Sequence, residues 1–203
     1  AILTHEAWQL ACDMPQPIRL GHILQHVLSR IDTPVIAHDL LLGRMPETIP
    51  TPAQETLFQE CLRSMGGALP PAFTDGGHET FDWETLLQIG LNGIHHHVRD
   101  RRQRARMDHE SQATCDFLEG MDDLCDAFRG YARRYARAAC QAGLTEAADA
   151  LAAVADEAPE TFREALQLMW IVGLVTCCFV ACNPTLTFGR VDQWLYPFYR
   201  RDL

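Results

Sequence analysis

The amino-acid sequence predicts a mainly α protein with at most one or two strands. Three long stretches, at 17–31, 82–107 and 111–141, carry apolar residues every three or four positions. That spacing places the apolar side chains on one face of an α-helix, as a helix packed on a core requires. No repeat, low-complexity tract or linker composition divides the 203 residues. We therefore expect residues 1–203 to form one helical unit without an internal boundary.

The first part of the chain predicts helices followed by an irregular connection. Pro17 suits the first turn of a helix, because its missing N–H would have no helical partner there. Residues 32–34, Asp-Thr-Pro, break this helix, and we expect the chain from there to Gly43 to be extended or turn-like. Residues 46–81 are dense in proline, glycine and threonine, which predicts loops around one short helix at roughly 52–65.

The middle of the chain predicts two long helices in succession. Asp82 is a suitable N-cap for the first, since its carboxylate can accept a hydrogen bond from a free N–H of the first turn. Gly90 and Gly93 inside this helix each cost about 1 kcal/mol relative to alanine. We expect close approach to another backbone to explain both glycines. Gly143 is a suitable C-terminal cap for the second helix.

The last part of the chain predicts two more helices and then a change of pattern. A short alanine-rich helix is expected from Thr145, and Pro159 is expected to open the next helix at its first turn. The β-branched stretch VTCCFV at 175–180 follows, and then a loop. The closing segment TFGRVDQWLYPFYRRDL, at 187–203, is dense in aromatic side chains that require burial.

Composition and charge exclude several classes of function. The net charge of −10 gives no basic face for duplex binding, so no nucleic-acid partner is expected. All 17 basic residues are arginine, which excludes a Schiff-base or P-loop lysine. The uncharged run at 165–182 is near the lower limit for a membrane span, and we expect a buried core element instead. Eight cysteines without C-x-x-C spacing favour free thiols in a reducing cytoplasm.

Three groups of residues could carry chemistry. The histidines at 95–97 point about 100° apart on a helix and cannot share one metal ion, so we expect a solvated helix face. Cys177 and Cys178 lie in an apolar run without a neighbouring base, and we expect them to pack in the core. His78 follows two glycines just before a helix N-terminus, a position that exposes a side chain to the helix dipole.

Three segments, in order along the chain, resemble the glycyl radical enzymes with the pyruvate formate-lyase-like fold. GGHETFDWETLLQIGLNGI at 76–94 resembles the G-H-x-x-x-D-Y and L-x-x-G-L-x-G-I elements of that family. PETFREALQLMW at 159–170 resembles its P-E-x-F-x-E-A-L-Q segment. The closing segment at 187–203 resembles S-x-G-R-x-D-Q-x-L-Y-P-F-Y. A weaker likeness covers 17–44, where the family has an arginine-led helix.

The resemblance implies a mainly α fold, the helical N-terminal layer of a ten-stranded α/β barrel, with at most the first barrel strands present. The closing segment would enter those strands after a turn set by Gly189 and Arg190. Its aromatic residues at 194–199 would pack on elements that these 203 residues do not contain. Since the family's enzymes are much longer, we expect an incomplete, N-terminal portion.

The resemblance also implies radical chemistry in the whole protein, with the glycine and cysteine that carry the radical outside these 203 residues. In the family, an activating enzyme that uses S-adenosylmethionine and an iron–sulfur cluster places a radical on a backbone glycine, from which it passes to a cysteine. The chain has no R-V-x-G-Y or G-C-x-E motif. We therefore expect no catalytic residue, bound cofactor or metal in this chain, and no activity from the chain alone.

The matched motifs are most similar to the dehydratase and lyase branch, which acts on glycerol, choline and similar substrates. In that branch an early histidine contacts polar groups of the substrate, and His78 is the matching position. Thr185 retains a hydroxyl in the run VACNPTLT at 180–187, where many members carry E-S-N-G-H-S-I-S. We expect His78, Thr185 and Asp82 to bind the substrate. The acidic residue of that run is absent, which leaves the substrate open.

The whole protein is therefore expected to be a cytoplasmic enzyme of anaerobic metabolism that breaks a bond in a small polar substrate by dehydration or elimination. Its expected partners are the activating enzyme, the rest of the barrel and further copies of itself in a homo-oligomer, without a membrane. Two alternatives remain, namely formate acetyltransferase-type acyl transfer and a non-catalytic helical interaction module.

Overall fold

The computed structural model describes residues 2–45, 49–65, 78–180 and 185–203. In chain order its elements are α1 (Ile2–Ala11), α2 (Gln16–Arg30), α3 (Pro52–Ser64), β1 (His78–Thr80), α4 (Trp83–Met107), α5 (Gln112–Gln141), α6 (Thr145–Asp156), α7 (Phe162–Val175), the π-helix η2 (Thr176–Val180), β2 (Thr185–Thr187) and α8 (Val191–Asp202). The described chain is mainly α, as the sequence predicts.

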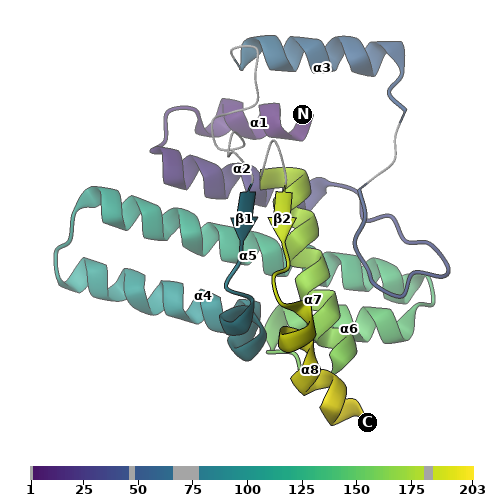
Figure 1. Ribbon diagram of the computed structural model, residues 1–203. Helices are drawn as coiled ribbons and strands as arrows, with labels where there is room; N and C mark the ends of the chain where they lie inside the picture. The colour runs from purple at the N-terminus through teal and green to yellow at the C-terminus, as the bar shows by residue number, and fades with distance from the viewer. Residues whose placement is uncertain (1, 46–48, 66–77, 181–184) are drawn as a thin grey trace.

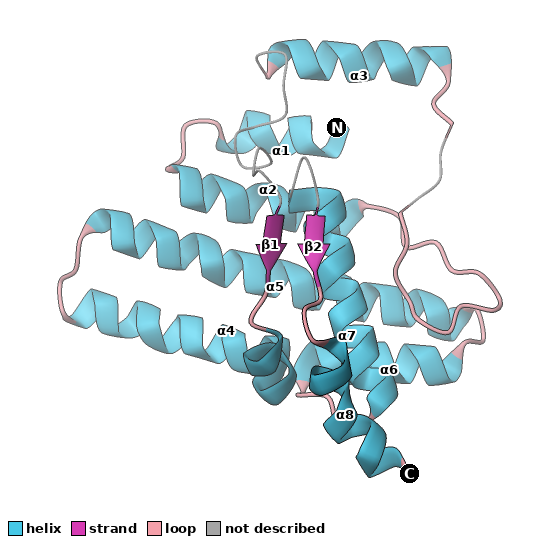
Figure 2. Cartoon of the chain, viewed as in Figure 1, coloured by secondary structure: helices cyan, strands magenta, loops and turns pink. Residues whose placement is uncertain are grey.

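The long helices α4 and α5 form an antiparallel pair, with α2 lying along α5 and α1 beyond α2 (Figure 1). The two strands lie side by side across this helical layer and run in the same direction (Figure 2). β1 leads into α4, and β2 leads to α8. Helix α7 packs against α4, α5, α6 and α8 and contributes much of its length to the main core.

Capping side chains set the helix starts. Four helices begin after a side chain that accepts a backbone hydrogen bond from the first turn, namely Thr51 before α3, Asp82 before α4, Ser111 before α5 and Thr161 before α7. The first three confirm the predicted starts. The expected opening of a helix at Pro159 is wrong, because the capping box of Thr161 and Glu164 starts α7 at Phe162.

The two glycines of α4 have different causes. Gly90 has φ +66°, and a Cβ at this position would lie 2.7 Å from the carbonyl oxygen of Glu157. The predicted close approach of another backbone is therefore confirmed at Gly90. At Gly93 the prediction is wrong, because a Cβ there would meet the side chain of Ile89 on the same helix.

The β-branched stretch at 175–180 continues the helix instead of forming a strand. After α7 the chain passes directly into η2. Phe179 of η2 packs against Tyr131 of α5 with ring centroids 6.3 Å apart. Burial of this kind overrides the weak intrinsic preference of β-branched residues for strands.

The closing segment also forms a helix, so the expectation that it enters barrel strands is wrong. Gly189 makes the predicted turn with φ +60°, and α8 follows. Leu195 and Phe198, three positions apart on one face, are buried in the main core of this chain. Tyr196 and Tyr199 are about half exposed, at 55% and 51%. Packing on absent elements is thus excluded for Leu195 and Phe198.

The uncharged run identified in the sequence is a core element. The window Phe162–Phe179 is long and apolar enough to cross a membrane by length and composition, but 56% of it is buried inside the protein. Leu168 and Ile171 are at most 1% exposed and belong to the main core. The prediction of a buried element is therefore confirmed.

Polar side chains of α7 hold the extended connection before residue 45. The amide of Gln167, which is 1% exposed, accepts a hydrogen bond from Leu42 N at 2.7 Å and donates one to Leu42 O at 2.8 Å. Trp170 Nε1 donates to Gly43 O at 2.9 Å. Buried backbone groups need such partners, so these bonds explain why an apolar helix retains a glutamine.

Helices α5 and α6 are joined by a cluster of charges at Asp156. Arg129 Nη2 donates to Asp156 Oδ1 at 2.7 Å, and Arg133 Nε donates to Oδ2 at 3.1 Å. Arg129 Nε also donates to the carbonyl oxygen of Ala155 at 2.9 Å. Hydrogen bonds from Arg133, together with those from Arg129, lower the pKa of Asp156 to about 2. The ionised carboxylate therefore stabilises the folded state.

We predict that Gln167→Ala lowers the free energy of unfolding by roughly 2–4 kcal/mol, because two buried backbone groups lose their partners. Urea denaturation measures the change. Gln193→Ala, at an exposed position of α8, is the matched control and should change stability by less than about 0.5 kcal/mol. Equal losses in the two variants would contradict the assignment.

We predict that Asp156→Asn destabilises the chain at pH 6 and that its difference from wild type disappears as the pH falls from about 4 to about 2. The pKa of Asp156 is lower in the folded state than its usual 3.8, so its contribution is present above that value and is lost on protonation. Urea denaturation of both proteins at pH 6 and at about pH 2 checks this. Asp149→Asn, at an exposed position of the same helix, is the control and should change stability at pH 6 by less than about 0.5 kcal/mol.

Candidate functional site

The strand pair brings together two of the three residues that the sequence predicts for substrate binding. β1 and β2 pair in parallel, with His78 opposite Thr185, Glu79 opposite Leu186 and Thr80 opposite Thr187. The structure thus places the backbones of His78 and Thr185 side by side, although they are far apart in the sequence. The side chains of both lie outside the described part of the chain. Their contact with a substrate remains a prediction.

Asp82 lies two residues after β1 and caps α4. Its Oδ1 accepts a hydrogen bond from Thr85 N at 3.0 Å, and its Oδ2 accepts one from the Thr85 hydroxyl at 2.7 Å. The bonds from the hydroxyl and the backbone of Thr85 lower the pKa of Asp82. The carboxylate is therefore charged at neutral pH, and each oxygen keeps lone-pair capacity for a second partner.

Trp83 joins the two strand ends, and the sequence analysis missed this residue. It is 1% exposed, and its Nε1 donates to Thr187 O at 3.2 Å. Its indole stacks on Phe188 with centroids 5.3 Å apart. An aromatic residue directly after the N-cap in HETFDW was the available signal, but its partner lies 104 residues later in the chain.

An apolar groove of about 650 Å³ begins beside Asp82 and runs between α4 and α5. Asp82 and Thr85 are polar groups at one end, and His97 and Arg101 also line it. Most of the remaining lining is apolar, from Phe81, Leu86, Ile89, Ile94, Val98, Leu118, Met121, Leu124 and Phe128. The groove is therefore adjacent to the strand pair and offers few hydrogen-bonding groups.

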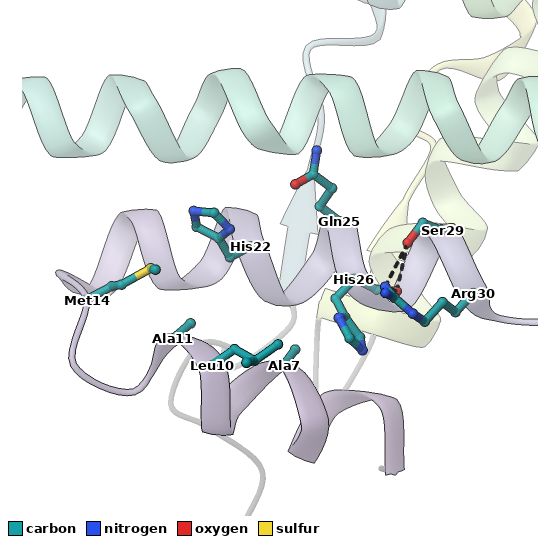
Figure 3. A pocket seen from close by; sticks show the side chains of 9 residues that line it. All are labelled: Ala7, Leu10, Ala11, Met14, His22, Gln25, His26, Ser29 and Arg30. Atoms are coloured by element: carbon teal, nitrogen blue, oxygen red, sulfur yellow. Dashed lines mark hydrogen bonds between the residues drawn. The ribbon is translucent and has the colours of Figure 1, made fainter.

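A second groove, of about 410 Å³, lies between α1 and α2 (Figure 3). His26 Nε2 lies 3.2 Å from Glu6 Oε2 and links the two helices, and the Ser29 hydroxyl donates to His26 O at 3.0 Å. His22 points away from α1 in this view. Asp82, the predicted substrate residue whose side chain is described, does not line this groove.

The histidine run does not form a uniformly solvated face. His96 and His97 are exposed, as predicted, but the prediction is wrong for His95, which is 1% exposed. His95 Nε2 lies 2.6 Å from Asp122 Oδ1, and Arg129 Nη1 lies 3.0 Å from Nδ1. Because an arginine can only donate, Nδ1 accepts and Nε2 carries the proton that is donated to Asp122.

His95, Asp122 and Asp126 have ligand atoms within 4.8 Å of one another, as a metal site would require. Arginines already occupy these atoms. Arg99 donates to both aspartates, at 2.9 and 3.3 Å, and Arg102 donates to Asp122 Oδ2 at 2.6 Å. We therefore assign this cluster to α4–α5 packing and not to a metal.

Cys177 and Cys178 lie in η2 and are partly buried. Burial raises the pKa of both thiols, and the proximity of Cys177 raises that of Cys178 further. The two cysteines are therefore poor nucleophiles at neutral pH, which agrees with a packing role.

Comparison with known proteins gives the family. A family model described as pyruvate formate lyase-like matches residues 39–203. The probable dehydratase YbiW of Escherichia coli is 32% identical over 142 residues, which are 62% of this chain and 17% of YbiW. The (2S)-3-sulfopropanediol dehydratase of Klebsiella oxytoca is 27% identical over 180 residues, which are 81% of this chain and 21% of that enzyme.

The solved structures share the fold of nearly the whole chain. The B12-independent glycerol dehydratase of Clostridium butyricum matches with a TM-score of 0.85 at 19% identity, over 98% of this chain and 34% of that one. The hydroxyproline dehydratase of Clostridioides difficile matches with a TM-score of 0.82 at 20% identity, over 99% and 34%. At these identities the likeness establishes the fold alone.

The chain spans about a third of the length of these solved structures. Its helical architecture therefore corresponds to the predicted helical layer of the larger fold. Since the family model covers residues 39–203, which include both strands and every helix from α3 to α8, the chain belongs to the pyruvate formate lyase-like family of glycyl radical enzymes.

Proposed function

We propose that this chain forms the helical layer and one edge of the substrate pocket of a glycyl radical dehydratase or lyase. The observation that carries the proposal is the register of β1 and β2, which sets His78 opposite Thr185 with Asp82 just beyond the strand end. His78 matches the position of the family's substrate-contacting histidine, and Thr185 keeps a hydroxyl in the run where many members carry serines. Support also comes from the relatives, which by name are dehydratases and sulfite-lyases.

In this proposal the three residues orient the substrate. The imidazole of His78 can donate or accept a hydrogen bond, the Thr185 hydroxyl can do both, and the Asp82 carboxylate can accept one. Together they suit hydroxyl groups of a small molecule and hold the reacting carbon in a fixed position. A glycyl radical installed elsewhere in the polypeptide by an activating enzyme would supply the hydrogen abstraction.

We further propose a small hydroxylated substrate. The names of the similar proteins specify glycerol, 1,2-propanediol, trans-4-hydroxy-L-proline, isethionate and (2S)-3-sulfopropanediol. The test is to assay the full-length enzyme with its activating enzyme, anaerobically, against these five compounds and against pyruvate with coenzyme A. Turnover of one of the five supports a dehydratase or lyase. Acyl transfer from pyruvate would identify a formate acetyltransferase, and turnover of none would favour the non-catalytic module.

We also propose that the full-length protein is a cytoplasmic enzyme of anaerobic metabolism that forms homo-oligomers. We also propose that the 203-residue chain alone is inactive, since neither a G-C-x-E nor an R-V-x-G-Y motif occurs in it. The same substrate panel, applied to the purified chain, tests this proposal.

We predict that His78→Ala and Thr185→Val each raise the KM of the full-length enzyme by about 2–10-fold, the effect of losing one hydrogen bond to the substrate. Steady-state kinetics on the best substrate of the panel gives the values. Thr145→Val, at an exposed position of α6, is the control and should leave KM unchanged. If KM stays constant in the first two variants as well, these residues do not bind the substrate.

We predict that two variants separate the helix-capping role of Asp82 from its role in binding the substrate. Asparagine also caps helices, so Asp82→Asn should keep the thermal stability while it raises KM several-fold. Asp82→Ala should lower stability by about 1 kcal/mol in addition. Differential scanning fluorimetry and kinetics distinguish these effects. A normal KM in Asp82→Asn would leave capping as the function of Asp82.

A further inference from the structure

The β1–β2 ladder is too short to fix its own register. Each strand has three residues, and an isolated two-stranded ladder is marginal in water. A slip by one residue would turn every side chain of one strand to the opposite face. Thr185 would then no longer pair with His78. Contacts outside the ladder must therefore hold the two strands in place.

Trp83 provides such a contact at the end of both strands. Its Nε1 donates to Thr187 O, the last carbonyl of β2, and its ring stacks on Phe188 at an interplanar angle of 22°. On its other side Phe81 meets the indole edge-on, with centroids 5.2 Å apart. Since Phe81 and Trp83 follow β1 directly, the indole connects the end of β1 to the end of β2.

Helix α7 packs closely against β2 and the residue that follows it. A Cβ at Gly173 would lie 3.2 Å from Cδ2 of Leu186 and 3.4 Å from Cζ of Phe188. This close packing sets the distance between β2 and α7. Apolar contacts are not directional, however, and do not fix the position of β2 along its own axis. The hydrogen bond from Trp83 is directional and therefore can fix that position.

We propose that Trp83 is a positioning residue, which holds Thr185 opposite His78 through the carbonyl of Thr187 and the ring of Phe188. The proposal rests on the proposed function, since it takes His78 and Thr185 to bind the substrate. Trp83 acts through the strands and does not itself touch the substrate.

The main test is Trp83→Phe in the full-length, activated enzyme, assayed against the five hydroxylated compounds named above. The variant keeps an aromatic ring and loses the N–H donor. We expect KM to rise about 3–10-fold. Trp170→Phe is the control for loss of an indole donor, because Trp170 also donates from Nε1 to a backbone carbonyl, that of Gly43, which lies outside the strands. An equal KM in the two variants would overturn the proposal.

A double-mutant cycle separates positioning from general destabilisation. If Trp83 acts through Thr185, Trp83→Phe should change KM less than about twofold in a Thr185→Val background. Full additivity of the two effects would contradict the proposal. Where His78→Ala and Thr185→Val themselves leave KM unchanged, the proposed function fails, and that result is distinct from failure of Trp83 alone.

Two further measurements test the proposal if Trp83→Phe does not fold or if the enzyme turns over none of the five compounds. Phe188→Leu removes the stacking partner at a position that is 37% exposed, and it should raise KM in the same direction. In the 203-residue chain, Trp83→Phe should accelerate amide hydrogen exchange at 78–80 and 185–187 more than Trp170→Phe does. Unchanged KM in Phe188→Leu, or equal exchange in the two tryptophan variants, would overturn the proposal.

Discussion

Helix α7 is largely apolar and buries one face in the main core, so the backbone groups that pack against that face must find their hydrogen bonds within the protein. Gln167 and Trp170 meet this requirement by binding the backbone of Leu42 and Gly43. Residues 42–43, which are in neither a helix nor a strand, are thereby held against the core. The same helix supports β2 at Gly173 and meets α8 at the buried Leu195 and Phe198.

This arrangement explains how two segments far apart in the sequence meet in one place. β2 follows α7 and η2 and rests on α7, whereas β1 precedes α4, which packs on α7 and α5. The two short strands thus pack on the helical layer, and Trp83, just after β1, hydrogen-bonds to the last carbonyl of β2. The candidate substrate residues depend on rigid helices and not on the few hydrogen bonds of the ladder itself.

The sequence was informative where local chemistry decides the structure. Capping side chains at Thr51, Asp82 and Ser111 give the helix starts, because these caps act within one turn. The pairing of His78 with Thr185 could not be derived from local pattern, since it depends on packing between distant segments. The buried His95 was missed for the same reason, because its partners Asp122 and Arg129 lie on another helix. The closing helix was missed because the resemblance favoured strands for this segment.

The central claim is that the register of β1 and β2 builds one edge of a substrate pocket. An anaerobic crystal structure of the full-length enzyme with a substrate of the panel bound tests it most directly. The account predicts His78 and Thr185 paired across the two strands, with polar atoms of both side chains within about 3.2 Å of substrate oxygens. A substrate bound elsewhere, or strands paired in another register, would contradict the account.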